Sequence, residues 1–352
     1  MMLFVGSTGD RAGHSLVTWT LARRLTERGL KVGFFKPFGT DPIPLDGVWT
    51  DPDARLFKNV LHLQEPLTTI CPFPLPDEVR MKGKGNRVLL QIRSLTQELA
   101  RDKDLLLIMG SRHVFFEGTT HAVPDIFLIT ELKLNLLLIQ RYRKPADTLY
   151  TILSLASLLR HQLKGVLINR VLPEKMDEVD RAVVQPLKRK GIFIPAVIPE
   201  DPSLAFRTLG DTAAALGGEF LCGKEKTGHL VGGMTPGASD LKGELRLFKR
   251  LYNKIVLLAP PNPPETHEED HGMRKVEGIL LTGGRRPPVR IFQLAKKNGI
   301  PLILIEEDTF VTLEKLAQQK PVLSPGDDLK VQRFTECLKH HADPDILLRP
   351  WG

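Results

Sequence analysis

Short apolar runs recur along the first two hundred residues, and the segments between them include one with clear helical spacing. The runs lie at residues 3–5, 32–35, 105–108, 136–139, 166–168 and 196–198. Residues 16–28 place apolar side chains on one side and charges on the other, and end at Gly29. Uninterrupted apolar strands that alternate with helices are typical of parallel sheets covered on both faces. The pattern predicts an α/β domain with a parallel sheet and helices on both faces.

A second α/β series follows a break in this pattern. Prolines at 199 and 202 interrupt it, a short helical segment at 212–216 leads to Gly217 and Gly218, and an irregular glycine-rich stretch continues to Gly237. Beyond it, we expect strands at 255–259, 278–281, 302–305 and 321–323 and helices at 241–251 and 289–298. We therefore predict one domain over residues 1–218 and a second, smaller α/β domain over 219–345.

The composition limits the kinds of protein to which the chain can belong. The chain has 352 residues, 42% of them hydrophobic, which suits a folded protein and excludes a disordered one. Its formal net charge of +8 is dispersed and only 6% of residues are aromatic, so we expect no nucleic-acid partner. No apolar run approaches the roughly 18 residues of a membrane span. Three separated cysteines without a CxxC pair fit a reducing compartment, and we expect a cytoplasmic protein.

Residues 7–15, Ser-Thr-Gly-Asp-Arg-Ala-Gly-His-Ser, lie between the first predicted strand and the first predicted helix. Small residues there let backbone N–H groups close on phosphate oxygens in front of a helix N-terminus. Gly13 and Ser15 fit such a P-loop, but His14 stands where the loop lysine is expected, and a histidine is shorter and mostly neutral at pH 7. We predict a degenerate Walker A loop in which Thr8, Gly9, Gly13, His14 and Ser15 contact the ligand.

In order along the chain, this loop, Lys36-Pro37, the segment 47–54 and the segment 165–170 resemble the dethiobiotin synthetase-like P-loop proteins. Segments 197–202, 278–284 and 308–310 extend the resemblance over almost the whole chain, to the amino-terminal region of long bacterial phosphotransacetylases and their stand-alone relatives. In those proteins the P-loop domain is followed by a DRTGG domain. The printed sequence leaves no room for the acetyltransferase domain, so we expect that it does not make acetyl phosphate by itself.

The resemblance implies roles for four further positions. Lys36 would be catalytic by neutralising phosphate charge, Ser15 and Asp51 would hold Mg²⁺, and Asn169 would bond the base of ATP or another nucleotide. Met109 stands where the family places another Mg²⁺ ligand, a glutamate, and a thioether is no ligand for this hard cation. Removing one charge-stabilising group costs about 10²–10³ in rate, so a site that lacks both the lysine and the glutamate is not expected to turn over ATP efficiently.

Three hypotheses for the function stay open. The leading one is a regulatory protein that senses a nucleotide or another phosphorylated metabolite, with weak or no ATP turnover. The second is an active Mg-ATP-dependent enzyme of the synthetase or ligase kind, in which His14 and Lys36 together replace the lost lysine. The third is an assembly scaffold that binds no ligand. Related domains occur in assemblies, so we expect a homo-oligomer, with a protein partner as a further expectation and no membrane partner.

The second predicted domain carries one candidate anion site. Residues 282–286, Thr-Gly-Gly-Arg-Arg, follow a predicted strand, and a glycine pair with two arginines at a strand's carboxyl end can receive an anion. A tight turn with two solvated arginines is the alternative.

Overall fold

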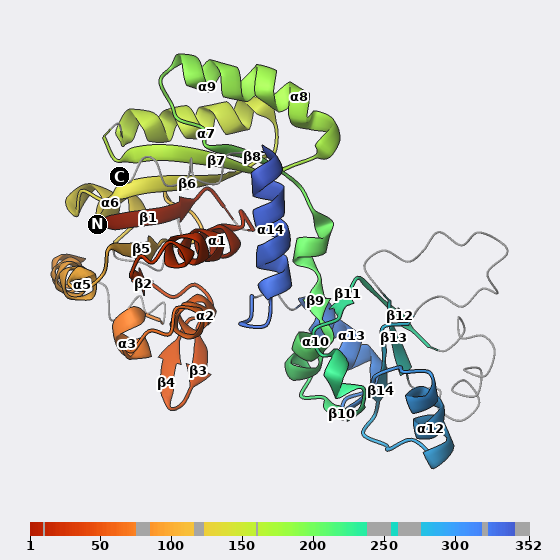
Figure 1. The fold of residues 1–352 in the computed structure, drawn as a ribbon. Coiled ribbons are helices and arrows are strands. Elements are labelled where there is room, and N and C mark those ends of the chain that lie inside the picture. Colours follow the sequence, from red (N-terminus) through yellow and green to blue (C-terminus); the bar gives the residue numbers. More distant parts are fainter. Residues whose placement is uncertain are drawn as a thin grey trace. The chain divides into compact units, whose positions relative to one another are not determined.

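The computed structural model describes residues 1–9, 11–74, 85–115, 123–159, 161–237, 255–259, 276–318 and 323–341. The chain divides into two compact units (Figure 1). The first unit comprises the residues up to Asp201 and again those from Asp327, and the second comprises Pro202–Gly326.

The first unit is built on a six-stranded sheet in which all paired strands are parallel. Every strand predicted for this region is confirmed, and each apolar run lies inside one. In spatial order the strands are β2 (Val32–Phe35), β5 (Leu105–Met109), β1 (Met2–Ser7), β6 (Asn135–Arg141), β7 (Leu163–Val171) and β8 (Ala196–Pro199). Because the strands are parallel, their carboxyl ends meet at one edge of the sheet.

Helices cover both faces of this sheet, as predicted. On one face Phe4, Leu106 and Leu138 pack with apolar residues of α5 (Gly85–Ala100), α6 (Asp125–Glu131) and α7 (Pro145–Leu158). Alternate strand residues such as Leu3 and Leu107 are equally buried but point to the other face. There α1 (His14–Glu27) contacts β1, β2 and β5, and α14 (Asp328–His341) contacts α1 and β8 (Figure 1).

Shorter elements complete the first unit. Between β2 and α5 lie a hairpin and two helices: β3 (Ile43–Leu45), β4 (Val48–Thr50), α2 (Pro52–Val60) and α3 (Leu67–Ile70). Between β7 and β8 the chain forms one continuous series of short helical segments: η1 (Pro173–Lys175), α8 (Met176–Val179), the π-helical η2 (Asp180–Val184) and α9 (Gln185–Arg189).

The second unit has a mixed five-stranded sheet. Its strands, in spatial order, are β10 (Glu219–Cys222), β15 (Leu302–Ile305), β14 (Gly278–Thr282), β13 (Ile255–Ala259) and β12 (Gly233–Pro236), and only β14 and β15 pair in parallel. Residues of α12 (Val289–Lys297) pack on one face, and those of α10 (Leu209–Ala215) and α13 (Thr309–Gln318) on the other. The remaining elements are η3 (Pro202–Ala205), β9 (Arg207–Thr208), η4 (Lys224–Lys226) and β11 (Leu230–Val231).

Only some of the elements of this unit were predicted from the sequence. The strands at 255–259, 278–281 and 302–305 and the helix at 289–298 are confirmed. The edge strands β10 and β12 were missed, because their short, glycine- and proline-flanked sequences carry little strand pattern. The predicted helix at 241–251 and most of the predicted strand at 321–323 lie outside the described residues.

The compact units divide the chain differently from the predicted ranges 1–218 and 219–345. Residues from Pro202 onward belong with the second unit, since Leu209 and Ala213 of α10 share its core. The residues of helix α14 fall in the range predicted for the second domain but belong to the first unit, where Arg333 Nε donates to Asp201 Oδ2 at 2.5 Å.

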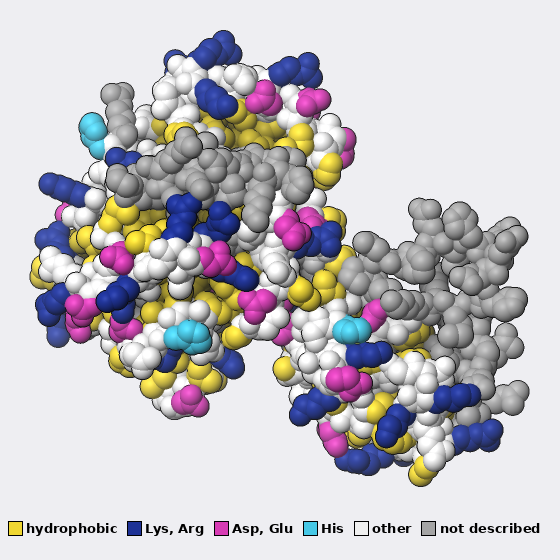
Figure 2. Space-filling model, in the orientation of Figure 1, with side chains coloured by type: hydrophobic (Ala, Val, Ile, Leu, Met, Phe, Trp, Pro, Cys, Tyr) yellow, Lys and Arg dark blue, Asp and Glu magenta, His cyan; other side chains and the backbone are white. Residues whose placement is uncertain are grey.

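On the face shown in Figure 2, basic and acidic side chains are interspersed over both units. This distribution agrees with the dispersed charge of the sequence. Among the helices that the structure describes, none combines the length and apolar character needed to cross a membrane.

The start of α10 offers a test of the second unit. Asp211 N donates to Thr208 Oγ1 at 3.0 Å and Thr208 N donates to Asp211 Oδ2 at 3.4 Å, a reciprocal capping box. We expect Thr208→Ala to lower the free energy of unfolding by about 1 kcal/mol, because Asp211 N loses its acceptor. Urea denaturation would measure this loss. Thr208→Ser keeps the hydroxyl and should lose much less, and equal losses in both variants would contradict the capping role.

Candidate functional site

The loop between β1 and α1 has the strongly turned backbone that a P-loop needs. Gly9 and Gly13 have positive φ angles of 145° and 91°, and Arg11 has a φ of 58°. Gly13 is the N-cap of α1, and an added Cβ there would lie 2.5 Å from Asn169 Nδ2. Both the dihedral angle and the lack of space therefore require glycine at position 13. Of the predicted loop, Asp10 lies outside the described residues.

The end of β7 holds this loop in place. Asn169 Nδ2 donates to the carbonyl of Ala12 at 2.8 Å, and Asn169 Oδ1 accepts from Arg170 N at 2.9 Å. Arg170 Nη1 donates to the carbonyl of Arg11 at 3.2 Å. Both the nitrogen and the oxygen of the Asn169 amide are therefore bonded within the protein. The predicted contact of Asn169 with a nucleotide base stays a prediction.

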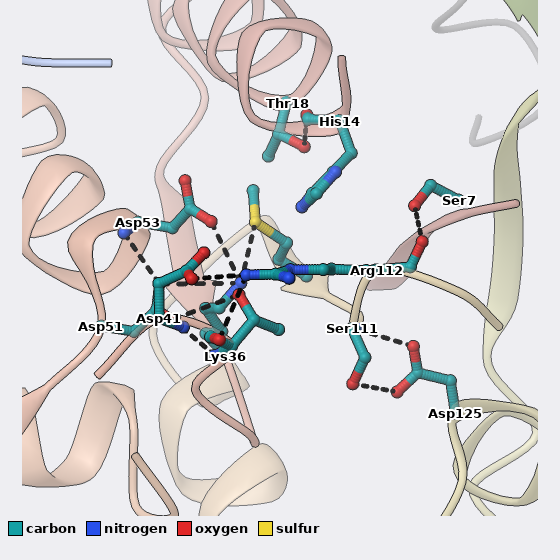
Figure 3. A network of polar contacts seen from close by, with 12 residues as sticks. Ser7, His14, Thr18, Lys36, Asp41, Asp51, Asp53, Ser111, Arg112 and Asp125 are labelled. Atoms are coloured by element: carbon teal, nitrogen blue, oxygen red, sulfur yellow. Dashed lines mark hydrogen bonds and ion pairs between the residues drawn. The ribbon is translucent and has the colours of Figure 1, made fainter. Parts of the chain in front are cut away.

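The segment after β5 lies along the other side of the loop. Ser7 Oγ donates to the carbonyl of Arg112 at 2.7 Å, and Val114 N donates to the carbonyl of Ser7 at 2.9 Å. Thr8 and His113 form an antiparallel bridge. From this segment the guanidinium of Arg112 extends to the Asp41 carboxylate (Figure 3). Sequence reasoning did not single out Arg112, since no motif marks it.

Lys36, at the end of β2, is the centre of a buried charge cluster. Its side chain is fully buried, and its Nζ lies 3.0 Å from Asp53 Oδ2, 3.7 Å from Asp51 Oδ1 and 3.7 Å from Met109 Sδ (Figure 3). The structure thus brings together three positions that the resemblance singled out, Lys36, Asp51 and Met109. Asp53, which lies in the same resembling segment 47–54 but was assigned no role there, completes the cluster.

Asp51 serves as the N-cap of α2. Its Oδ1 accepts from Asp53 N at 2.9 Å, and its Oδ2 accepts from Thr40 N at 2.7 Å and from Asp41 N at 3.2 Å. The side chain of Ser15 hydrogen-bonds to Asp53 and so connects the P-loop to the cluster. The two residues expected to hold Mg²⁺ therefore both make polar contacts within the protein.

The ionisation of the cluster follows from burial and pairing. Burial acts to lower the pKa of Lys36, but the carboxylates of Asp51 and Asp53 outweigh it and the pKa lies above its ordinary value. Burial acts to raise the pKa of Asp53, but Lys36, His14 and the hydrogen bond from Ser15 outweigh it and hold the pKa below its ordinary value. Lys36 and Asp53 are consequently a charged pair at neutral pH.

Two family models match the chain. A family model described as an AAA domain matches residues 2–208, and a DRTGG domain model matches residues 211–319. The chain belongs to this AAA-domain family. The predicted pairing of a P-loop domain with a DRTGG domain is thereby confirmed.

Relatives of both expected kinds are found. The phosphate acetyltransferase of Synechocystis sp. is 24% identical over 98% of this chain, and that of Pseudomonas aeruginosa is 23% identical over 99%. This chain spans about half of their length, 51% and 52%. The ATP-dependent dethiobiotin synthetase of Thermodesulfovibrio yellowstonii is 24% identical over 60% of this chain and 93% of its own length.

Among solved structures, the MinD cell division protein of Aquifex aeolicus is similar over 58% of this chain and 83% of its own, at 15% identity and a TM-score of 0.36. A similarity at that score supports no conclusion about the site.

In this arrangement the AAA domain does not fit a Mg²⁺ held by Ser15 and Asp51. The ion requires oxygen ligands, whereas Met109 offers sulfur and the ammonium of Lys36 already neutralises the carboxylates. Within the described ranges no three histidine, cysteine, aspartate or glutamate side chains are grouped to hold a metal ion. Lys36 as a catalytic residue, and Ser15 and Asp51 as metal ligands, stay predictions.

In the DRTGG domain the candidate anion site at 282–286 is a bonded turn. Gly283 N donates to the carbonyl of Glu307 at 2.7 Å, and Gly284 N donates to that of Ile305 at 2.9 Å. Arg286 Nη2 bonds both oxygens of Glu219 at 2.7 and 2.9 Å. These contacts favour the tight turn over an anion receptor.

Replacing Lys36 with methionine tests the charge cluster. The substitution leaves the buried carboxylate of Asp51 and the mostly buried one of Asp53 without their cation, so we expect the free energy of unfolding at neutral pH to fall by about 3–5 kcal/mol. Chemical denaturation measures this loss. The double variant Lys36→Met/Asp53→Asn removes one of the stranded charges and should recover much of it. If the single variant is as stable as the wild type, the cluster is not the charged pair described here.

Acid should act differently on Asp53 in the two proteins. In the wild type the pKa of Asp53 is lowered, so its contribution to stability is present above the ordinary value and is lost as the pH falls through the lowered pKa. In Lys36→Met, burial without the ammonium should raise the pKa of Asp53, so protonation stabilises the fold. Stability should then increase as the pH falls from about 7 toward about 5. A parallel decrease in both proteins would contradict this.

Proposed function

We propose that the AAA domain binds a nucleotide or another phosphorylated small molecule at its P-loop and turns over ATP weakly or not at all, so that the protein acts as a sensor. The ion pair of Lys36 with Asp53 carries this proposal. Phosphoryl transfer is catalysed mainly by positioned charge that stabilises the transferring group. The Lys36 side chain is fully buried and its ammonium already faces two carboxylates, so it offers little net positive charge to a phosphate.

Phosphate binding is nevertheless supported by the rest of the loop. The positive φ angles of Gly9 and Gly13 suit a backbone that turns around an anion, and the first turn of α1 contains no acidic residue. A helix N-terminus of this kind favours an anion. The relative named ATP-dependent dethiobiotin synthetase makes a nucleotide a reasonable ligand class.

A sensor must also pass the effect of ligand binding on to another molecule. We propose a second copy of this chain, or another protein, as the recipient. Exposed apolar side chains on the first unit, such as Tyr150 at 77% and Leu158 at 62%, are suited to such a contact. Light scattering with and without ligand would detect a change in oligomeric state.

The proposal is tested first by calorimetric titration of the whole chain with ATP, with and without Mg²⁺, at about pH 7. We expect binding in the micromolar range, on the order of −8 kcal/mol, without a requirement for Mg²⁺. Phosphate release should be no faster than in Lys36→Ala. Magnesium-dependent turnover that collapses in Lys36→Ala would establish the enzyme hypothesis instead. If no nucleotide produces binding heat or a thermal shift, the scaffold hypothesis is the one that remains.

A second test restores the two lost charges. His14→Lys with Met109→Glu supplies a loop lysine and an oxygen ligand, so we expect Mg²⁺-dependent nucleotide affinity to rise about tenfold or more, since a tenfold change requires only about 1.4 kcal/mol. The control His14→Gln with Met109→Leu changes the same positions without adding charge. An equal affinity in both double variants would mean that the loop no longer positions a phosphate for them.

A further inference from the structure

The ion pairs near the carboxyl ends of β2 and β5 differ in how far water reaches them. In the Lys36 cluster the lysine side chain is fully buried and that of Asp53 is 15% exposed. In the other pair Arg112, which follows β5, contacts Asp41, which follows β2, and these side chains are 28% and 42% exposed. An ion pair in contact with water contributes little to stability, whereas a buried one is costly to break. The pair of Arg112 with Asp41 is therefore the one that opens at low cost.

The backbone around Asp41 is held independently of this pair. Thr40 N and Asp41 N both donate to Oδ2 of the buried Asp51, at 2.7 and 3.2 Å. Arg112 Nη2 also donates to the carbonyl of Thr40 at 3.3 Å. The Asp41 carboxylate can therefore leave the guanidinium by a movement of its side chain alone. It is already partly exposed, so water solvates it once it is released.

The backbone of Arg112 is fixed to the start of the P-loop. Its carbonyl accepts from Oγ of Ser7, the first residue of the loop, at 2.7 Å. On its other side Ser111 N donates to Asp125 Oδ2 at 2.6 Å, and both of these residues are buried. Arg112 is thus anchored next to the loop, with only its side chain able to change partner.

The Arg112 side chain extends toward Asp41 beneath His14 in the view of Figure 3. The start of α1 approaches the neighbouring acidic residues as well, because Ser15 hydrogen-bonds to Asp53. His14 stands at the position expected for the loop lysine, and it is shorter and mostly neutral at pH 7. A guanidinium beside this turn supplies the positive charge that the histidine lacks.

We propose that Arg112 binds a phosphoryl group of the ligand in place of the missing loop lysine, and that Asp41 occupies its guanidinium until the ligand displaces it. This inference rests on the proposed function, because the ligand is the same phosphorylated compound. Carboxylate and phosphate oxygens both suit the planar donors of a guanidinium, so the two anions compete for Arg112. Asp41 is then an internal competitor that lowers the affinity for the ligand.

Calorimetric titration of the full chain with ATP, in the presence of a chelator, tests the exchange. Arg112→Gln should weaken binding about tenfold, because a charged contact to phosphate is lost, and Arg112→Lys, which keeps the charge without the planar fork, should lie between. Asp41→Asn should tighten binding about threefold, because the ligand no longer displaces a carboxylate. The matched control is Asp46→Asn, which removes the same charge at the exposed turn between β3 and β4 and should leave the affinity unchanged.

The double variant decides whether the two residues compete. In the Arg112→Gln background the further change Asp41→Asn should have no effect on ATP binding, because no guanidinium is left for the carboxylate to occupy. If Asp41→Asn tightens binding equally with and without Arg112, Asp41 acts only as a nearby negative charge, and the exchange is overturned.

The same titrations separate this inference from the proposed function. If Arg112→Gln binds ATP like the wild type, the role of Arg112 is wrong and the proposed function stands. If ATP binds only after Asp41→Asn, the exchange is supported and the carboxylate keeps the site closed. If neither the wild type nor Asp41→Asn binds ATP, both proposals fail.

A measurement without ligand tests whether the pair opens at low cost. The thermal midpoints of Arg112→Gln and Asp41→Asn should stay within about 2–4 °C of the wild type, because a water-exposed ion pair contributes little to stability. A much larger fall in either variant would show that the pair is a structural contact, and Asp41 would then not be exchanged for a ligand.

Discussion

The ion pairs of the buried Lys36 ammonium are the interaction around which the adjoining ends of β2 and α2 are arranged. An ammonium group persists in a protein interior only if opposite charges face it closely, because its desolvation is costly. Here Asp53 and Asp51 meet that need, and both lie at the start of α2. The end of β2, the start of α2 and the P-loop serine are thereby connected through a few side-chain contacts. A change at any of these positions would disturb the others.

At Lys36 the protein supplies both signs of charge itself. This internal neutralisation stabilises the folded chain. It also limits the positive charge that Lys36 can offer to any other anion, because the ammonium already faces two carboxylates.

Local sequence patterns predicted the strands and the loop that depend on neighbouring residues. The apolar runs located all six strands of the parallel sheet, and the glycine spacing located the P-loop. Both predictions succeeded because strand burial and tight backbone turns depend on residues that are close in sequence. Contacts between distant segments were not predictable: Asp53 pairs with Lys36, and the amide of Asn169 bonds the carbonyl of Ala12. The edge strands of the second unit escaped notice because short, glycine-flanked strands lack a clear period. Residues 328–341 fall in the range predicted for the second domain but form α14 of the first unit, because a local pattern does not say on which unit a helix packs.

The position of α14 makes the first unit a discontinuous domain with the second unit inserted in it. The chain leaves the first unit after Asp201 and returns at Asp327, and the contact of Arg333 with Asp201 places α14 beside the point of departure. A fragment ending near residue 218 would therefore lack a helix whose Val331 and Phe334 are buried. Separating the two units would therefore require excision of residues 202–326 and rejoining of the cut ends, because truncation would remove α14.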